Sequence, residues 1–132
     1  MTTVHHRIHT EDGTPVNQRY RRIPPNQNEE VKEHLQVLLE RGVIRPSQSD
    51  YASLVVLVHK KPGALRLCVD YHCLNAKTRK DAYPLPRIDE SLDALGRARC
   101  FSASDLASAY NQVEVHLDDR HKTAFTTPMG LY

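Results

Sequence analysis

The sequence predicts an α+β fold, in which a β-hairpin and a mainly antiparallel sheet pack against helices. Three observations support this prediction. Apolar residues recur at helical spacing in residues 31–39, strand-like runs flank a turn in residues 53–70, and further strand-like runs follow residue 100. The resulting order of helix, hairpin, helix and three strands is typical of an α+β protein.

The first 25 residues are expected to form an extended arm with at most one short strand, because a glycine and three prolines interrupt this stretch. We expect the arm to lie over another part of the protein. It also carries a basic cluster, formed by Arg19, Arg21 and Arg22.

The first helix is expected to begin near Asn26 or Asn28, since asparagine is a favoured N-cap, and to end at Gly42. Glutamates close to its beginning suit the positive end of the helix dipole. One apolar face is predicted, which consists of Val31, Leu35, Leu38 and Leu39.

The clearest β signal is a predicted hairpin. Residues 53–61 are rich in β-branched side chains, Pro62 and Gly63 suit a turn, and residues 64–70 alternate like a strand. Lysines lie at its tip and Arg66 lies on its return strand. Such lysines are also a common way to keep the edge of a sheet soluble, and that alternative stays open here.

The rest of the chain alternates between short helices, short strands and connections. We expect an extended linker where two prolines exclude a helix, and a helix where Ile88, Leu92 and Leu95 recur at helical spacing. The predicted elements are a helical turn at 74–78, the linker at 83–86, a helix at 88–96, strands at 100–104, 111–115 and 122–127, and a turn at 118–120.

Charge is distributed unevenly along the chain. The net charge is the number of Lys and Arg residues minus the number of Asp and Glu residues. It is 7 − 7 = 0 over residues 1–58, 7 − 2 = +5 over 59–87, and 4 − 7 = −3 over 88–132, which sums to the total of +2. A basic middle and an acidic end suit a polyanion held by one part and a metal ion held by the other. Segregation by chance is the alternative.

The cysteine count indicates reduced thiols. Three cysteines are an odd number, and the first residues lack the apolar region of a secretory signal. No apolar run reaches the roughly 20 residues needed to span a bilayer. We therefore expect a cytoplasmic or nuclear protein. Cys68, His72 and Cys73 form only a partial zinc set, so we expect no zinc there.

Asp105 is the most informative single residue. It follows a short apolar stretch, residues 101–104, and precedes one or two expected helical turns at 107–110. A carboxylate at the end of a strand can hold a divalent cation near a phosphate. It can equally accept a hydrogen bond as a helix N-cap. These ten residues alone leave both interpretations open.

Several ordered motifs resemble the reverse transcriptases of Ty3/gypsy-type LTR retrotransposons, from about His5 to Tyr132. The motifs, in order, are Leu57-Val58-His59-Lys60-Lys61-Pro62-Gly63, Arg66-Leu67-Cys68-Val69-Asp70-Tyr71-His72-Cys73-Leu74-Asn75, Asp81-Ala82-Tyr83-Pro84-Leu85-Pro86-Arg87-Ile88-Asp89, Phe101-Ser102-Ala103-Ser104-Asp105-Leu106, Lys122-Thr123-Ala124-Phe125-Thr126-Thr127-Pro128 and Gly130-Leu131-Tyr132. The resemblance implies the fingers and the first part of the palm of a right-hand polymerase.

The resemblance also implies roles for individual residues. Asp105 would be catalytic and, with the carbonyl of Leu106, would bind Mg²⁺ in a two-metal site. Tyr110 would lie beneath the incoming sugar and exclude a 2′-hydroxyl. Lys61 and Arg66 would grip the triphosphate. These residue types suit phosphoryl chemistry, because Mg²⁺ prefers oxygen ligands and cations neutralise the charge that develops on the phosphates.

Fewer features support the remaining candidates. Asp70 is assigned to the substrate region, although support of Arg66 or of the hairpin base suits it better. Lys60, His72 and Asn75 are expected to contact nucleic acid. His72 departs from the family pattern, in which arginine is usual, and this departure weakens the expected contact.

Further departures concern Ala107, where lysine is frequent in the family, and Asn111, where an aromatic residue often follows the aromatic residue beneath the sugar. The family's second metal motif, an aromatic–x–Asp–Asp hairpin, would lie beyond Tyr132. We therefore expect an arm at 1–25, a fingers-like segment at 26–87 and an incomplete palm at 88–132. On its own, this chain is expected to be inactive.

Two classes of function follow. The first is a segment of an RNA-directed DNA polymerase that uses dNTPs and an RNA or DNA template-primer, with the rest of the palm, the thumb and RNase H supplied by the same polyprotein. The alternative is a non-catalytic nucleic-acid-binding module or a truncated element copy without function.

Overall fold

A computed structural model describes residues 4–59, 63 and 65–132. The expected tip of the hairpin, including Lys60 and Lys61, lies outside the described residues. The chain forms two compact units, which are described separately below. The larger comprises Met1–Arg79 and Val113–Tyr132, and the smaller is Lys80–Gln112. The expected division of the chain into arm, fingers-like segment and palm, at residues 25/26 and 87/88, stays a prediction. That division is based on polymerase subdomains, whereas the two units are defined by contacts within the chain.

A four-stranded sheet is the centre of the larger unit, in the order β2-β1-β3-β4. The expected hairpin is confirmed, because β1 and β2 pair antiparallel from Leu54 opposite Asp70 to His59 opposite Leu65. β3 and β4 also pair antiparallel, whereas β1 and β3 are parallel. The strands are β1 (Ser53–His59), β2 (Leu65–Asp70), β3 (Phe125–Thr127) and β4 (Gly130–Leu131).

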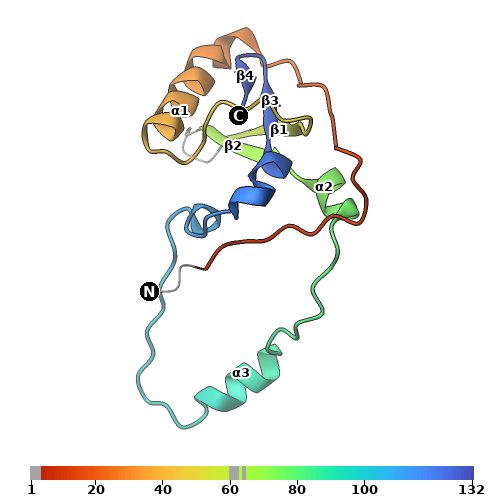
Figure 1. Cartoon of the computed structure of the whole chain (residues 1–132). Coiled ribbons are helices and arrows are strands. Elements are labelled where there is room, and N and C mark those ends of the chain that lie inside the picture. The colour runs from red at the N-terminus through yellow and green to blue at the C-terminus, as the bar shows by residue number, and fades with distance from the viewer. Residues whose placement is uncertain (1–3, 60–62, 64) are drawn as a thin grey trace. The chain divides into compact units, whose positions relative to one another are not determined.

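One helix, α1 (Asn28–Glu40), packs against β2 in this unit (Figure 1). A 3₁₀ turn, η1 (Pro25–Gln27), leads into it, and no side chain caps its first turn. The chain leaves the helix through Gly42, whose φ of 67° suits a residue without a Cβ atom. The helix is therefore confirmed within two residues of its expected beginning, although the expected asparagine cap is wrong.

Apolar side chains of α1 and the sheet form the core. Val31 is 0% exposed and Leu35 is 2% exposed, so the predicted apolar face is buried. A second cluster lies around Leu74 on α2 (His72–Lys77), the helix that was expected at 74–78. The buried members of the two clusters are Ile23, Val31, Leu35, Val55 and Phe125 in one, and Val16, Tyr51, Leu74 and Ala124 in the other.

The N-terminal arm is packed along the larger unit without forming a helix or a multi-residue strand, and it passes close to α2 (Figure 1). Isolated bridges join His6 to Val115, Thr10 to Thr78 and Asn17 to Ala52. Side chains of the arm are also buried, namely Ile8, Val16 and Ile23. The arm is therefore fastened at several points of its length.

The smaller unit contains α3 (Ile88–Leu95) and the 3₁₀ turn η2 (Ala109–Asn111). The expected helix is confirmed, and the chain before it has no helix or strand, as its prolines predict. None of the residues of α3 is buried, and Ile88 remains 78% exposed. No described helix of the protein is long and apolar enough to cross a membrane.

Two expected strands are wrong. Residues 100–104 form no strand, and their side chains are exposed. Residues 111–115 supply only the single bridge of Val115. A strand needs a neighbour for its backbone hydrogen bonds, and among the described residues none pairs with 100–104. The expected turn at 118–120 belongs to a longer 3₁₀ helix, η3 (Leu117–Thr123), and the following strand begins only at Phe125.

Candidate functional site

Asp105 and Leu106 lie in the segment of the smaller unit that connects α3 to η2, and Tyr110 lies in η2 itself. All three are exposed, with Leu106 at 66% and Tyr110 at 93%. The residue before η2 is Ser108, which has a φ of 50°. Because no described N–H donates to the Asp105 carboxylate, the interpretation of Asp105 as a helix cap is wrong. Its oxygens are instead available to a ligand.

Arg66 is exposed on β2, the strand of the hairpin that packs against α1. Gln27 Nε2 lies 2.8 Å from His59 Nε2, at the end of β1. The Glu30 carboxylate accepts a hydrogen bond of 3.2 Å from the backbone N–H of Leu65, where β2 begins. The end of η1 and the first turn of α1 therefore contact the two strands of the hairpin next to its tip.

Asp70 has a structural contact at the base of the hairpin. Its Oδ1 accepts a hydrogen bond of 3.0 Å from the backbone N–H of His72, the first residue of α2. This bond closes the turn between β2 and α2, as an Asx turn does. His72 and Asn75 are both exposed on α2, so they are accessible to a partner.

The expected site residues belong to different units. Arg66, Asp70, His72 and Asn75 are in the larger unit, and Asp105, Leu106 and Tyr110 are in the smaller one. Lys60 and Lys61 lie outside the described residues. Within their own units the other expected site residues are exposed, except Asp70, which is half-buried.

Asp105 is the expected metal ligand with the best chemical fit. Its exposed carboxylate and the backbone carbonyl of Leu106 are hard oxygen donors, which suit Mg²⁺. Among the described residues, no three His, Cys, Asp or Glu side chains gather into a metal-binding group. The donors present therefore fit one part of a divalent-metal site in kind and do not complete it.

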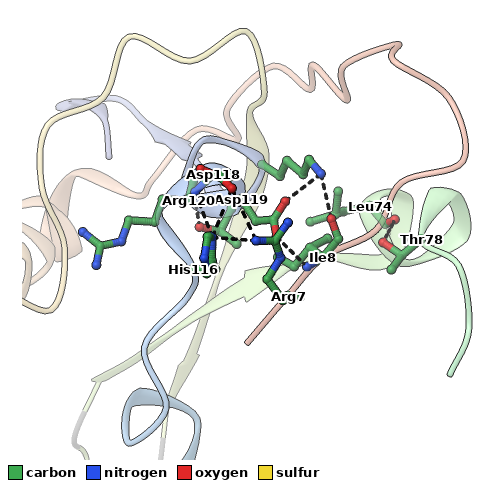
Figure 2. A network of polar contacts seen from close by, with 10 residues as sticks. Arg7, Ile8, Leu74, Thr78, His116, Asp118, Asp119 and Arg120 are labelled. Carbon is green, nitrogen blue, oxygen red and sulfur yellow. Dashed lines mark hydrogen bonds and ion pairs between the residues drawn. The ribbon is translucent and has the colours of Figure 1, made fainter. Parts of the chain in front are cut away.

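The most buried charged group among the described residues was missed by the sequence analysis. The side chain of Asp119, a residue of η3, is 4% exposed and contacts the N-terminal arm (Figure 2). Its Oδ2 forms an ion pair with Arg7 Nε at 3.0 Å and accepts a hydrogen bond of 3.0 Å from the backbone N–H of Ile8. Its Oδ1 accepts from Lys122 Nζ at 2.9 Å, and this ammonium also donates to the carbonyl of Ile8 at 2.7 Å.

These partners determine the ionisation of Asp119. Burial by itself raises the pKa of this carboxyl, but the hydrogen bonds from Lys122 and Ile8 and the charges of Lys122 and Arg7 outweigh it. The net effect lowers the pKa of Asp119 below its ordinary value. The ionised carboxylate fastens the arm to η3. Its spacing of three residues from Lys122 was visible in the sequence, whereas nothing there indicated the contact with Arg7.

More exposed contacts surround this buried group. Arg7 also lies 2.8 Å from His116 Nδ1 and 3.3 Å from Asp118 Oδ2 (Figure 2). Arg120 pairs with the side chain of Glu114 and donates to the carbonyl of Val115. The network is therefore structural, because its cations already have partners within the protein.

Comparison with known sequences gives the family. The family model described as reverse transcriptase (RNA-dependent DNA polymerase) matches residues 58–131, which is more than half of the chain. This protein belongs to the reverse transcriptase family. The match includes β2, α2 and the segment that carries Asp105.

Individual relatives are transposon polyproteins, which confirms the resemblance recognised in the sequence motifs. The retrovirus-related Pol polyprotein from transposon 412 of Drosophila melanogaster is 39% identical over 131 residues, which are 95% of this chain and 11% of that protein. The transposon Tf2-3 polyprotein of Schizosaccharomyces pombe is 36% identical over 110 residues, 83% of this chain and 8% of that protein. The chain thus spans a small part of the curated relatives that it matches.

Solved structures support the fold class. A mutant of the prototype foamy virus protease-reverse transcriptase superposes with a TM-score of 0.82 at 25% identity, over 96% of this chain and 17% of that chain. A foamy viral protease-reverse transcriptase in complex with dsDNA gives a TM-score of 0.67 at 21% identity, over 97% of this chain and 25% of that chain. The α+β architecture is that of reverse transcriptases.

Proposed function

We propose that this chain is a segment of an RNA-directed DNA polymerase, which adds dNTPs to a primer 3′ end on an RNA or DNA template. The observation that carries this proposal is the family match over residues 58–131. The matched region contains three of the expected site residues, Arg66, Asp105 and Tyr110. The transposon relatives support a polyprotein context, in which the remaining palm, thumb and RNase H regions are partners.

Asp105 and the carbonyl of Leu106 hold Mg²⁺ in this proposal. When bound, the metal neutralises charge that develops on phosphate oxygens during in-line transfer. Arg66 and Lys61 bind the triphosphate, and a guanidinium suits phosphate because it donates two parallel hydrogen bonds. Tyr110 selects the sugar by steric contact, and its 93% exposure in the smaller unit leaves the ring free for that contact.

The template-primer is assigned to the basic middle of the chain, with Lys60, His72 and Asn75 as contacts. Asp70 supports the base of the hairpin in this proposal, because its Oδ1 accepts a hydrogen bond from the N–H of His72. Cytoplasmic or nuclear localisation is part of the same proposal, since retroelement replication needs an intracellular template.

Nucleic-acid binding tests the proposal on the chain itself. Fluorescence anisotropy with a labelled template-primer is expected to show affinity that falls with salt, as release of counterions from phosphates requires. Alanine at Lys60, Lys61 and Arg66 weakens it. A matched control replaces three exposed arginines outside the proposed site, Arg41, Arg45 and Arg97, and removes the same charge. Binding whose affinity does not depend on salt contradicts the proposal, and so does an equal loss of affinity in the site variant and in the control variant.

Primer extension tests the catalytic part. One aspartate does not hold two metal ions in the geometry that nucleotidyl transfer needs, so the 132-residue chain with Mg²⁺ and dNTPs is expected to leave the primer unextended. The matched measurement uses the Asp105→Asn variant. Templated extension that this substitution abolishes contradicts the expected inactivity and assigns a complete site to the chain.

The second candidate is a binding module without catalysis, and the excess charge of +5 over residues 59–87 favours it. The two functions differ in their response to nucleotide. A polymerase segment is expected to bind a dNTP with Mg²⁺ through Asp105, whereas a binding module retains only metal-independent affinity for nucleic acid. Binding of a fluorescent dNTP with and without Mg²⁺, in the wild type and in Asp105→Asn, distinguishes them.

A further inference from the structure

A basic, exposed segment of the N-terminal arm has no assigned role. It consists of residues 19–22, Arg-Tyr-Arg-Arg, and is called the arginine segment here. All four residues are exposed, and Tyr20 keeps 56% of its surface accessible. Singly exposed aromatic residues are ordinary, but this ring lies within a run of three arginines.

The backbone on both sides of the arginine segment is fixed. Before it, the N–H of Gln18 donates to the carbonyl of Ala52 at 2.9 Å, and the N–H of Ala52 donates to the carbonyl of Val16 at 2.7 Å. After it, Ile23 is 8% exposed and belongs to the main core. The segment is therefore presented on the surface of the larger unit between two anchors, which reduces the entropy lost when it binds a partner.

Its charge is not neutralised within the described part of the protein. No Asp or Glu occurs between Gly13 and Asn28, so three arginines stand without an acidic neighbour in sequence. None of the ion pairs found among the described residues includes any of the three guanidinium groups. Arg7, by contrast, is occupied by Asp119. The arginine segment therefore offers free donors to an anion.

We propose that the arginine segment binds single-stranded nucleic acid, with the guanidinium groups on phosphates and the ring of Tyr20 stacked on a base. The proposal rests on the proposed function for its partner class and adds a contact surface outside the hairpin and outside residues 101–110. Guanidinium forks match phosphate oxygens in pairs. An exposed ring among cations is typical of surfaces that stack unpaired bases, which a duplex does not present.

Other anionic partners fit the segment less well. A membrane surface is bound by several apolar side chains beside the cations, and here only one ring is present. An acidic peptide would use the charge but leaves the ring of Tyr20 without a planar partner. Single-stranded nucleic acid uses both features, and it is therefore the occupant to which the proposal commits.

The test measures anisotropy of a labelled 12-residue oligo(dT) with the full 132-residue chain as salt is raised. Each phosphate contact on a single strand contributes about 0.7 to the slope of log affinity against log salt. The variant Arg19→Ala/Arg21→Ala/Arg22→Ala is therefore expected to lower the slope by about 2. The control Arg41→Ala/Arg45→Ala/Arg97→Ala removes the same charge elsewhere and is expected to retain the slope.

Substitution of the ring tests stacking separately. Tyr20→Phe keeps a planar ring and is expected to retain affinity, whereas Tyr20→Leu is expected to weaken it by roughly five-fold or more. A circular-dichroism melt accompanies each variant. If the triple alanine variant fails to fold, the triple lysine variant replaces it, since lysine keeps the charge and loses the paired hydrogen bonds. Its expected result is a retained slope with weaker binding.

The outcomes that overturn the proposal are specific. If the control Arg41→Ala/Arg45→Ala/Arg97→Ala lowers the salt slope equally, the effect comes from net charge. If Tyr20→Leu leaves the affinity unchanged, stacking of the ring is excluded. If poly-aspartate or phosphatidylserine vesicles bind as tightly, with the same loss in the arginine variant, the partner is not nucleic acid. Binding that depends on Lys60, Lys61 and Arg66 alone overturns this inference and leaves the proposed function intact. No binding by the wild type contradicts both.

Discussion

The buried carboxylate of Asp119 gives the sharpest stability prediction. The Asp119→Asn variant keeps the size of the side chain and removes the charge that Arg7, Lys122 and the N–H of Ile8 approach. Two cations and one buried donor then face a neutral amide. We expect the arm to detach more readily from η3 and the free energy of unfolding to fall.

The structure limits the size of this loss. Removal of one partner from a buried ion pair costs about 3–5 kcal/mol when the other partner stays buried. Lys122 is 15% exposed, but Arg7 is 41% exposed and can be rehydrated after the substitution. We therefore expect a loss of about 2–4 kcal/mol, which is a large part of the ordinary stability of a small domain.

Urea denaturation followed by circular dichroism at pH 7 measures this loss. With a denaturant slope of about 2 kcal/mol/M, the midpoint is expected to fall by about 1–2 M. The matched control is Asp118→Asn, because the side chain of Asp118 is 70% exposed and contacts the same arginine. It is expected to change stability by less than about 1 kcal/mol. A loss below about 1 kcal/mol for Asp119→Asn refutes the reasoning.

The same variant predicts a dependence on acid. The folded state lowers the pKa of Asp119, so the stabilisation is fully present above the pKa of the unfolded chain. It is lost as the pH falls through the folded pKa. The difference between wild type and Asp119→Asn is therefore expected to shrink below about pH 4. A difference that stays constant from pH 7 to pH 2 contradicts the assigned ionisation.

Other predictions concern the core, an aromatic hydroxyl and the smaller unit. Burial raises the pKa of Tyr71 to about 12 from 10.0, because the folded protein favours the neutral hydroxyl. The resulting contribution to the free energy of unfolding is present below pH 10 and is lost as the pH rises towards 12. Tyr71→Phe, which removes a 2.8 Å bond to the carbonyl of Thr123, is expected to cost about 1 kcal/mol at pH 7 and to lose less stability in alkali. Val31→Ala empties a fully buried position and is expected to cost about 2 kcal/mol in urea denaturation; an effect below about 0.5 kcal/mol contradicts its place in the core. Leu92→Ala, at a residue 60% exposed on α3, is expected to change the same measurement by less than about 0.5 kcal/mol, and a larger loss shows that the side chain is buried in solution.

The elements that the sequence predicted well have local causes. The hairpin was predictable because β-branched runs and a Pro-Gly turn favour it without help from distant residues. The helix α1 was predictable because its apolar residues share one face and Gly42 supplies the left-handed residue after its end. The family was predictable because several motifs occur in a specific order, which chance does not produce.

The candidate site was predictable only as a set of residue types. Ordered motifs indicated Asp105 and Arg66, but they contain no information on exposure or on internal partners. The structure adds that Asp105 is exposed, whereas Asp70 is engaged by the N–H of His72. It also contradicts the helix-cap interpretation of Asp105, which had been reasonable from local preference alone.

What the sequence by itself determined is the local structure and the family: the helices α1, α2 and α3, one hairpin and the reverse transcriptase motifs. Only the tertiary structure decided the parallel pairing of β1 with β3, the absence of a strand at 100–104, and the burial of Asp119. The physical reason is the same in each case. A strand needs a partner, and a buried carboxylate needs donors, and for Asp119 one of those donors is a backbone N–H 111 residues earlier in the chain.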